Sequence, residues 1–120
     1  MNNWIGFGRL VREPETNYTQ QGKVYVKFTL GINRNYKNTE GNYDADFIDC
    51  VAWGKTAEAI GTYVHKGQRI LVEGNLNINT YEGKDGGKHR SASINVRTFH
   101  FIEKVENIEF TEDIGEIIDE

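Results

Sequence analysis

Apolar and polar residues alternate most regularly between residues 24 and 32. Five apolar side chains occupy every second position there: Val24, Val26, Phe28, Leu30 and Ile32. Because successive side chains of a strand point to opposite faces, this period of two predicts a half-buried β-strand. We expect an earlier strand at about 5–11, a turn region at 13–22 that holds the only proline, and an exposed hairpin loop at 35–44.

A second alternating segment, 47–53, separates large rings from small apolar side chains. One side of this strand would carry Phe47, Asp49, Val51 and Trp53, and the other Ile48, Cys50 and Ala52. The small apolar set suits a protein core, so we expect the two rings to face outward. Cys50 is the only cysteine, which excludes an intramolecular disulfide and fits a buried thiol in a reducing compartment.

The same test on residues 69–81 predicts a long strand with a polar outer face. Its inward positions would be Ile70, Val72, Leu76 and Ile78, and its outward positions Arg69, Asn75, Asn77, Asn79 and Tyr81. Three glycines among charged residues predict a flexible loop at 82–88. The last strand, at about 93–102, changes parity between Val96 and Phe99, so we expect a bulge near Thr98.

One segment follows a helical period instead. Apolar residues recur at three- and four-residue spacing at Ala57, Ile60, Tyr63 and Val64. Thr56 is the expected N-cap and Gly67 the expected C-terminal stop. The resulting all-β order is that of an OB-fold, a five-stranded Greek-key β-barrel with one short helix between strands 3 and 4. An SH3-like barrel is the rival interpretation.

Charge is unevenly distributed along the 120 residues, a length that suits one domain without stabilising disulfides. The net charge is -4, yet all 14 Lys and Arg lie at or before Lys104. Residues 1–106 therefore carry a small basic excess, and we expect them to form the domain. Residues 107–120 make an acidic tail that we expect to be disordered.

The ionisable residues form no catalytic or metal-binding pattern. His65, His89 and His100 lie in separate predicted elements, so we expect no enzyme activity, no metal and no cofactor. Three nearby aspartates match no calcium loop: Asp44, Asp46 and Asp49. The chain shows neither a bilayer-spanning apolar run nor a signal peptide, which favours a cytoplasmic protein without membrane contact.

The outward rings lie beside amides and cations, a combination that suits unpaired nucleic acid. Flat bases stack on exposed aromatic rings, and Lys and Arg neutralise the phosphate backbone. Parity places three rings on this face: Phe47, Trp53 and Tyr81. We expect Trp4, in contrast, to be a core or subunit-interface ring.

Five groups of residues follow one another along the chain. They are Gly8-Arg9-Leu10 with Pro14-Glu15, Phe28-Thr29-Leu30 with Asn33-Arg34, the run from Ala45 to Lys55, the run from Tyr63 to Gly67, and Val72-Glu73-Gly74. Together they resemble the bacterial and phage single-stranded DNA-binding proteins (SSB) over about residues 3–102. The resemblance implies an OB-fold that pairs into dimers and usually tetramers. It also implies a homo-oligomer that coats single-stranded DNA and protects it during replication, recombination and repair.

The resemblance further implies four stacking rings: Tyr36, Phe47, Trp53 and Tyr81. Alternation continued from Ile32 would turn Tyr36 inward, so we expect a kink near residues 31–33. Candidate phosphate contacts are surface cations, namely Arg9, Arg34, Lys37, Lys55, Lys84, Lys88 and Arg90. Arg34 and Lys55 lead this set, because each lies within two residues of a proposed stacking ring.

The family usually ends, after a long linker, in an acidic tip with Ile-Pro-Phe that recruits replication and repair proteins. Here the linker is nearly absent, and the end reads Ile114-Gly115-Glu116-Ile117-Ile118-Asp119-Glu120. Acidic and apolar residues remain, but the terminal aromatic does not. This departure puts docking to the usual partners in question and fits a compact phage or plasmid version.

Two alternatives stay open on the sequence. One is an OB-fold protein that prefers RNA or serves as a primosome-type accessory protein. The other is a protein-interaction adaptor whose sheet edge binds peptides.

Overall fold

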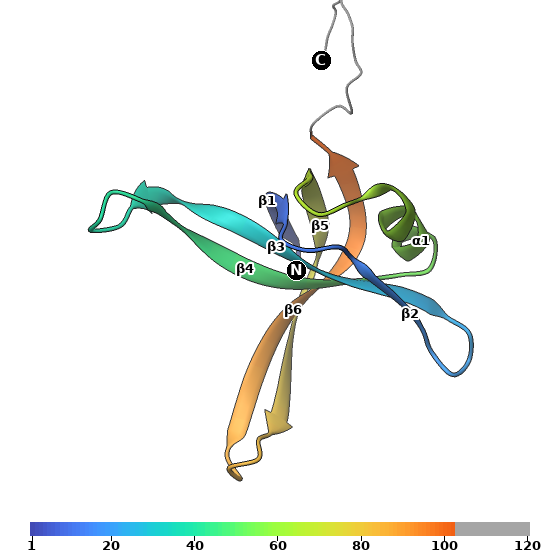
Figure 1. The fold of residues 1–120 in the computed structure, drawn as a ribbon. Coiled ribbons are helices and arrows are strands. Elements are labelled where there is room, and N and C mark those ends of the chain that lie inside the picture. Colours follow the sequence, from blue (N-terminus) through green and yellow to red (C-terminus); the bar gives the residue numbers. More distant parts are fainter. Residues whose placement is uncertain (103–120) are drawn as a thin grey trace, which may run out of the picture.

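The computed structural model describes residues 1–102, which form six strands and one helix (Figure 1). The elements are β1 (Trp4–Leu10), β2 (Glu15–Tyr18), β3 (Val24–Lys37), β4 (Tyr43–Trp53), α1 (Gly54–Tyr63), β5 (Arg69–Glu82) and β6 (Lys88–Phe101). Within these residues, no helix has the length and apolar character needed to cross a membrane. The predicted acidic tail at 107–120 lies outside the described residues.

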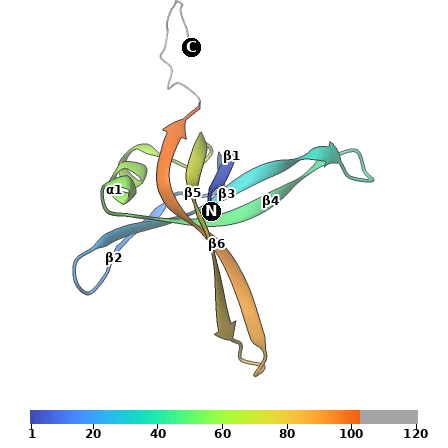
Figure 2. The same cartoon turned by 180° about the vertical axis from the view of Figure 1, so that it is seen from behind.

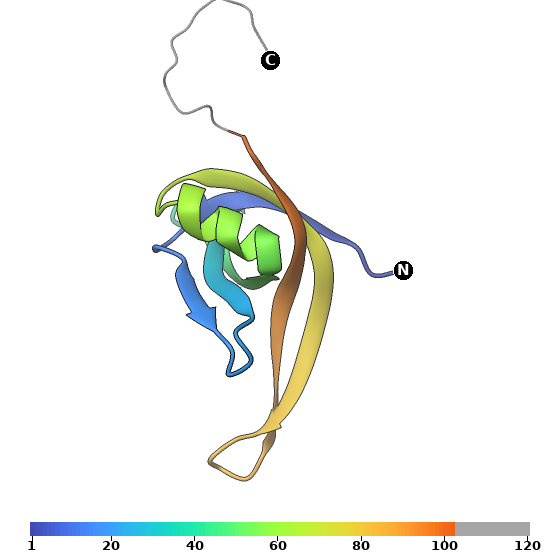
Figure 3. The ribbon, with the colours of Figure 1, turned by 90° about the vertical axis from the view of Figure 1, so that its right-hand side faces the viewer.

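The five long strands close into the expected OB-type barrel, with α1 between the third and fourth of them. The sheet order is β1-β5-β6-β4-β3-β2, and β1 also pairs with β3 through Arg9–Gly31 and Leu10–Leu30. β4 and β6 run parallel over two residue pairs, whereas the other pairings are antiparallel. Figure 3 shows α1 packed against the barrel, on the side away from the tip of the β5–β6 hairpin.

The barrel interior is apolar because the inward positions of the long strands meet there. Its largest fully buried side chains are Leu10, Val26, Leu30, Ile60, Val64, Ile70, Val72 and Ile94. Cys50 and Ala52 are buried as well, whereas Phe47 and Trp53 are exposed, so the two predicted sides of β4 are correct. Trp4 packs against this core from its edge, in line with its expected role.

Two hairpins extend beyond the barrel, as Figures 1 and 2 show from opposite sides. We call residues 33–46 the β3–β4 arm and residues 75–93 the β5–β6 arm. The second arm makes one prediction wrong. Leu76 and Ile78 were expected in the core, but their side chains are 41% and 54% exposed. β5 extends beyond the barrel after Gly74, so the side chains on its inward-facing side no longer enter a core.

Two further expectations about the first half of the chain are wrong. Residues 15–18 lie in the expected turn region, but they form β2 and pair with β3. The turn itself covers 19–23, where the backbone N–H of Thr19 donates to the carbonyl of Lys23 at 2.8 Å. The expected loop at 35–44 is also shorter, because β3 continues to Lys37 and β4 begins at Tyr43.

The helix and the last strand agree with the sequence only in part. α1 begins at Gly54 rather than after Thr56, because Gly54 has a φ of +63° and turns the chain from β4 directly into the helix. Of the four residues at helical spacing, Ala57, Ile60 and Val64 are buried and Tyr63 is exposed. The bulge near Thr98 is confirmed: Thr98 pairs with Glu73 and Val96 with Gly74, so that one extra residue lies between them.

Candidate nucleic-acid interface

The outer face of β3 and β4 carries two of the predicted rings, Phe47 and Trp53, and each lies opposite a residue of β3. Opposite pairs on this face are Tyr25–Trp53, Lys27–Val51, Thr29–Asp49 and Gly31–Phe47. Phe47 is 65% exposed and Trp53 is 45% exposed. They are six positions apart on an extended strand, so the two rings lie roughly 20 Å apart along the face.

Phe47 borders a groove where β1 crosses β3. The ring lies against Gly31, where a Cβ would be 3.6 Å from it. At Gly8, a Cβ would come within 2.7 Å of the carbonyl oxygen of Gly31, so β1 can approach β3 this closely only without a side chain. The groove has a volume of about 690 Å³, and Arg9, Lys66 and Arg69 line it together with Phe47. An aromatic ring and three cationic residues therefore meet at one groove.

Lys66 was absent from the predicted cations, because only the fold brings the loop after α1 to this groove. Glu13 holds that loop. Its Oε2 accepts a hydrogen bond from the backbone N–H of Lys66 at 2.9 Å, and its Oε1 lies 3.2 Å from Nδ1 of His65. The backbone hydrogen bond, followed by the contact with His65, lowers the pKa of Glu13.

Trp53 has an aromatic neighbour that sequence reasoning did not single out. The ring of Tyr25 lies opposite it on β3, with 5.0 Å between ring centroids and 33° between ring planes. The ammonium of Lys27 is 6.0 Å from the centroid of the Tyr25 ring. Parity did place Tyr25 on the outer side of its strand, but the pairing with Trp53 depends on the register between two strands.

A second groove lies between this face and the base of the β5–β6 arm. Its volume is about 510 Å³. The sheet contributes Lys27, Asp49 and Val51 to the lining, and the arm contributes Asn79 and Ser91. Arg12, Glu13 and Glu15 line it as well, so the groove carries charges of both signs. Polar groups of two separate hairpins thus converge in the interval between Phe47 and Trp53.

Tyr81 lies near the tip of the β5–β6 arm and is exposed, as predicted. It pairs across the strands with His89, with 5.6 Å between ring centroids and 30° between ring planes. Nε2 of His89 lies 3.1 Å from Oδ1 of Asp85 in the hairpin turn. A hydrogen bond from the backbone N–H of Gly87, followed by the contact with His89, lowers the pKa of Asp85.

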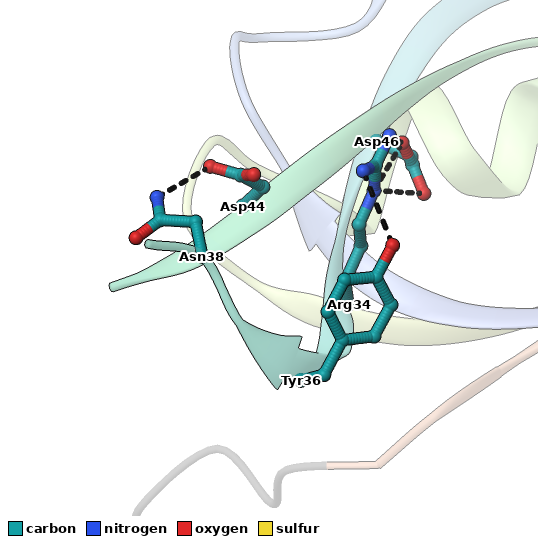
Figure 4. Close-up of polar contacts among 5 residues, drawn as sticks. All are labelled: Arg34, Tyr36, Asn38, Asp44 and Asp46. Carbon is teal, nitrogen blue, oxygen red and sulfur yellow. Dashed lines mark hydrogen bonds and ion pairs between the residues drawn. The ribbon is translucent and has the colours of Figure 1, made fainter. Parts of the chain in front are cut away.

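Tyr36 is exposed on the β3–β4 arm, where the strand register shifts between Asn33 and Lys37. The irregularity begins just after residues 31–33, where the sequence predicts a kink. Figure 4 shows that its hydroxyl faces Arg34, whose guanidinium forms a fork with Asp46. Nε and Nη2 of Arg34 donate to Oδ1 of Asp46 at 3.1 and 3.0 Å, and Nη1 donates to the Tyr36 hydroxyl at 3.4 Å. The hydrogen bonds to Asp46 raise the pKa of Arg34.

The tip of the same arm presents a further exposed ring. Tyr43 pairs with Lys37, whose ammonium lies 5.9 Å from the ring centroid. The side chain of Asn38 organises the turn, because it donates to Asp44 at 3.0 Å (Figure 4) and accepts from the backbone N–H groups of Glu40 and Asn42. Sequence reasoning missed Tyr43 because it fell inside the expected loop.

The remaining predicted cations occupy different places. Lys55 is exposed in the first turn of α1, two residues after Trp53. Lys84 lies in the turn of the β5–β6 arm. Lys88 and Arg90 pair with Glu82 and Thr80, which alternate with Tyr81 and so lie on the other face of the arm. The structure therefore brings only some of the predicted cations beside rings, and their contacts with phosphate stay predictions.

The three nearby aspartates are each engaged by another side chain: Asp44 by Asn38, Asp46 by Arg34 and Asp49 by Thr29. Among residues 1–102, no group of three or more His, Cys, Asp or Glu side chains is placed to hold a metal ion. Burial, with a smaller effect of Asp49, raises the pKa of the Cys50 thiol to about 12. Such a thiol is a poor nucleophile at neutral pH.

Several known proteins are similar to this chain. The family model described as the single-strand binding protein family matches residues 1–102. Single-stranded DNA-binding protein 1 of Streptococcus pyogenes is 34% identical over 116 residues, which cover 97% of this chain and 89% of that protein. Single-stranded DNA-binding protein 3 of Listeria innocua is 38% identical over 107 residues, with 89% and 67% covered. The single-stranded DNA-binding protein of Bacillus cereus is 39% identical over 103 residues, with 86% and 61% covered.

A solved structure shares the fold. The chain in "Plasmodium falciparum SSB complex with ssDNA" matches with a TM-score of 0.74 and 20% sequence identity, and the match covers 86% of this chain and 96% of that one. At this level of identity, the likeness supports the OB-type barrel and the position of its helix.

Proposed function

Because the chain belongs to the single-strand binding protein family, we propose that it binds single-stranded DNA along the outer face of β3 and β4 without reading base sequence. One observation carries the proposal. Phe47 and Trp53 expose their rings on the same strand face, beside grooves lined by Arg9, Lys66 and Lys27. Base–aromatic stacking tolerates any sequence, because every base has a π face.

In this role the protein coats unpaired DNA during replication, recombination and repair, and it acts in the cytoplasm on nucleoid or phage DNA. The function needs binding alone, and its relatives are named as DNA-binding proteins. We therefore propose a protein that is not an enzyme. The pKa of the buried Cys50 thiol supports this proposal, since it leaves the one cysteine unreactive.

We also propose that the protein is a homo-oligomer, with a tetramer preferred and a dimer as the alternative. Two sets of exposed apolar side chains support this proposal. Ile5 and Phe7 lie on β1, and Leu76 and Ile78 lie on the β5–β6 arm. Apolar side chains grouped on an exposed face are typical of surfaces that a second subunit covers.

The central test is a titration with oligo-dT, followed by fluorescence anisotropy and light scattering. We expect a double variant, F47A/W53A, to bind at least roughly thirtyfold more weakly, because each lost stack costs about 1–3 kcal/mol. The logarithm of the wild-type affinity should fall with the logarithm of salt concentration, with a slope near -0.7 for each phosphate contact. Light scattering of the same samples reports the oligomeric state.

Two controls accompany this experiment. Y63A removes an equally exposed ring from α1, outside the proposed interface, and should bind as the wild type does. Oligo-U of equal length tests the RNA alternative, which a clear preference for RNA would favour. Undiminished DNA binding by F47A/W53A would contradict the proposal and favour a protein-interaction adaptor.

A further inference from the structure

We propose that Tyr25, Trp53 and Lys27 form an additional nucleotide-binding subsite, where one unpaired base stacks on the ring pair and Lys27 contacts the adjacent phosphate. The subsite would extend the DNA path from β4 across β3 toward the β2–β3 hairpin. It rests on the proposed function, but it assigns Tyr25 and Lys27, which the sequence did not mark as contacts.

The first support is the geometry of the two rings. Tyr25 and Trp53 occupy opposite positions of the β3–β4 ladder and project from the same face. Their centroids are 5.0 Å apart and their planes are 33° from parallel, so the rings overlap in an offset stack rather than edge to face. Tyr25 thus holds the exposed Trp53 ring in place, and the uncovered ring surface of the pair is left to a base.

The second support is the position of the cation. Lys27 is exposed and two residues from Tyr25 on the same face, and its ammonium is 6.0 Å from the Tyr25 centroid. Its neighbours in the sheet are Val51 on β4 and Glu15 on β2. Within residues 1–102, no ion pair within 4.0 Å engages Lys27, so its charge is available to a ligand.

The third support is continuity with the groove at the base of the β5–β6 arm. Lys27 and Val51 line that groove and form the row next to Tyr25 and Trp53. A DNA strand that runs from Phe47 along this groove therefore reaches the ring pair at the end of β4. Asn17 of β2 lies beyond Tyr25 in the ladder and marks the edge of the subsite.

A cross-strand ring pair also stabilises a sheet by itself, so the experiment must separate binding from folding. Y25A removes the ring, Y25L keeps an apolar side chain on the hairpin, and Y25F keeps the π face. Binding of labelled oligo-dT is measured by anisotropy, and thermal unfolding is measured on the same samples. Y63A is the matched control, since it removes a tyrosine from the exposed face of α1.

We expect Y25A and Y25L to weaken binding about five- to tenfold, as for the loss of one modest stack, while Y25F and Y63A stay within twofold of the wild type. K27Q should reduce the magnitude of the salt slope by about 0.7, the share of one phosphate contact. Wild-type affinity in Y25L, or an unchanged slope in K27Q, would overturn the subsite. Such a result, with F47A/W53A still defective, would leave the proposed function intact.

Discussion

Arg34 shows how a residue's partners change its expected role. The sequence made it a leading candidate for a phosphate contact, because it lies two residues from Tyr36. In the structure, its guanidinium is bound to Asp46 through two hydrogen bonds near 3.0 Å, and it also donates to the Tyr36 hydroxyl. A forked pair of this kind fixes the orientation of a guanidinium. Arg34 thus orients Tyr36, and Asp46 competes with any phosphate for it.

This competition leads to a prediction for D46N. We expect tighter binding to oligo-dT at low salt and a salt slope steeper by about 0.7, because Arg34 then becomes available for one phosphate contact. Affinity is measured by anisotropy over a series of salt concentrations. D44N is the control, since Asp44 lies on the same arm but accepts its hydrogen bond from Asn38. A slope that stays at the wild-type value in D46N would contradict this role of Asp46.

Parity along single strands predicted the outward rings of β4 but could not predict ring partners. Phe47 and Trp53 followed from the contrast with Cys50 and Ala52, which needed knowledge of one strand only. The pairing of Tyr25 with Trp53 depends on the register of β3 against β4. The partner of Arg34 depends on the same register. Such information is carried by contacts between distant residues, which a local pattern does not contain.

Elements were predictable where they lie on the barrel and less so where they leave it. The alternation of β3 and β4 and the bulge in β6 followed from local sequence. The exposure of Leu76 and Ile78 did not, because β5 keeps its period of two after the barrel ends at Gly74. β2 was missed because its four residues, Glu15–Tyr18, are mostly polar and pair with only one strand. Its stability comes from β3 rather than from its own pattern.

The connection between β1 and β2 is tied to the loop after α1 by Glu13. The pKa of Glu13 is lower in the folded protein than its usual value of 4.5. A carboxylate with a lowered folded-state pKa stabilises the fold above the unfolded-state pKa, and this stabilisation is lost as pH falls through the folded-state pKa. The Glu13 contacts therefore support the fold at neutral pH and stop doing so in acid.

We expect E13Q to have a slightly lower melting temperature than the wild type at neutral pH, because Gln keeps an acceptor but loses the charge. The difference should shrink as pH falls below 4.5 and then disappear. Differential scanning calorimetry over a pH series measures it. E15Q is the control, since Glu15 lies on the same part of the chain but faces Lys27 across the β2–β3 ladder instead of holding the loop after α1. A difference of constant size down to strongly acidic pH would argue against an electrostatic role of Glu13.

At the scale of the whole molecule, basic and acidic residues are separated along the chain. All 14 Lys and Arg lie at or before Lys104, while residues 107–120 hold six of the 18 acidic residues. An acidic segment joined to a mildly basic domain can compete with a polyanion for the same cations. Since such long-range attraction is screened by salt, the competition should be strongest at low ionic strength.

We therefore predict that deletion of residues 107–120 tightens binding to oligo-dT modestly at low salt, and that the gain vanishes at high salt. A full-length variant with the six tail acids replaced by Asn and Gln tests charge separately from length, and it should behave as the deletion does. Anisotropy titrations at several salt concentrations measure both. Equal or weaker binding by the truncated chain at low salt would refute the prediction.

The short pairing between β1 and β3 affects where the barrel can open locally. Only Arg9–Gly31 and Leu10–Leu30 pair these strands, followed by one hydrogen bond from the N–H of Val11 to the carbonyl of Thr29. A ladder this short is a natural place for local opening. Because Arg9 and Gly31 also line the groove beside Phe47, single-stranded DNA bound in that groove would hold β1 and β3 together. Bound DNA would then stabilise the closed barrel, and the closed barrel would in turn preserve the groove that binds the DNA.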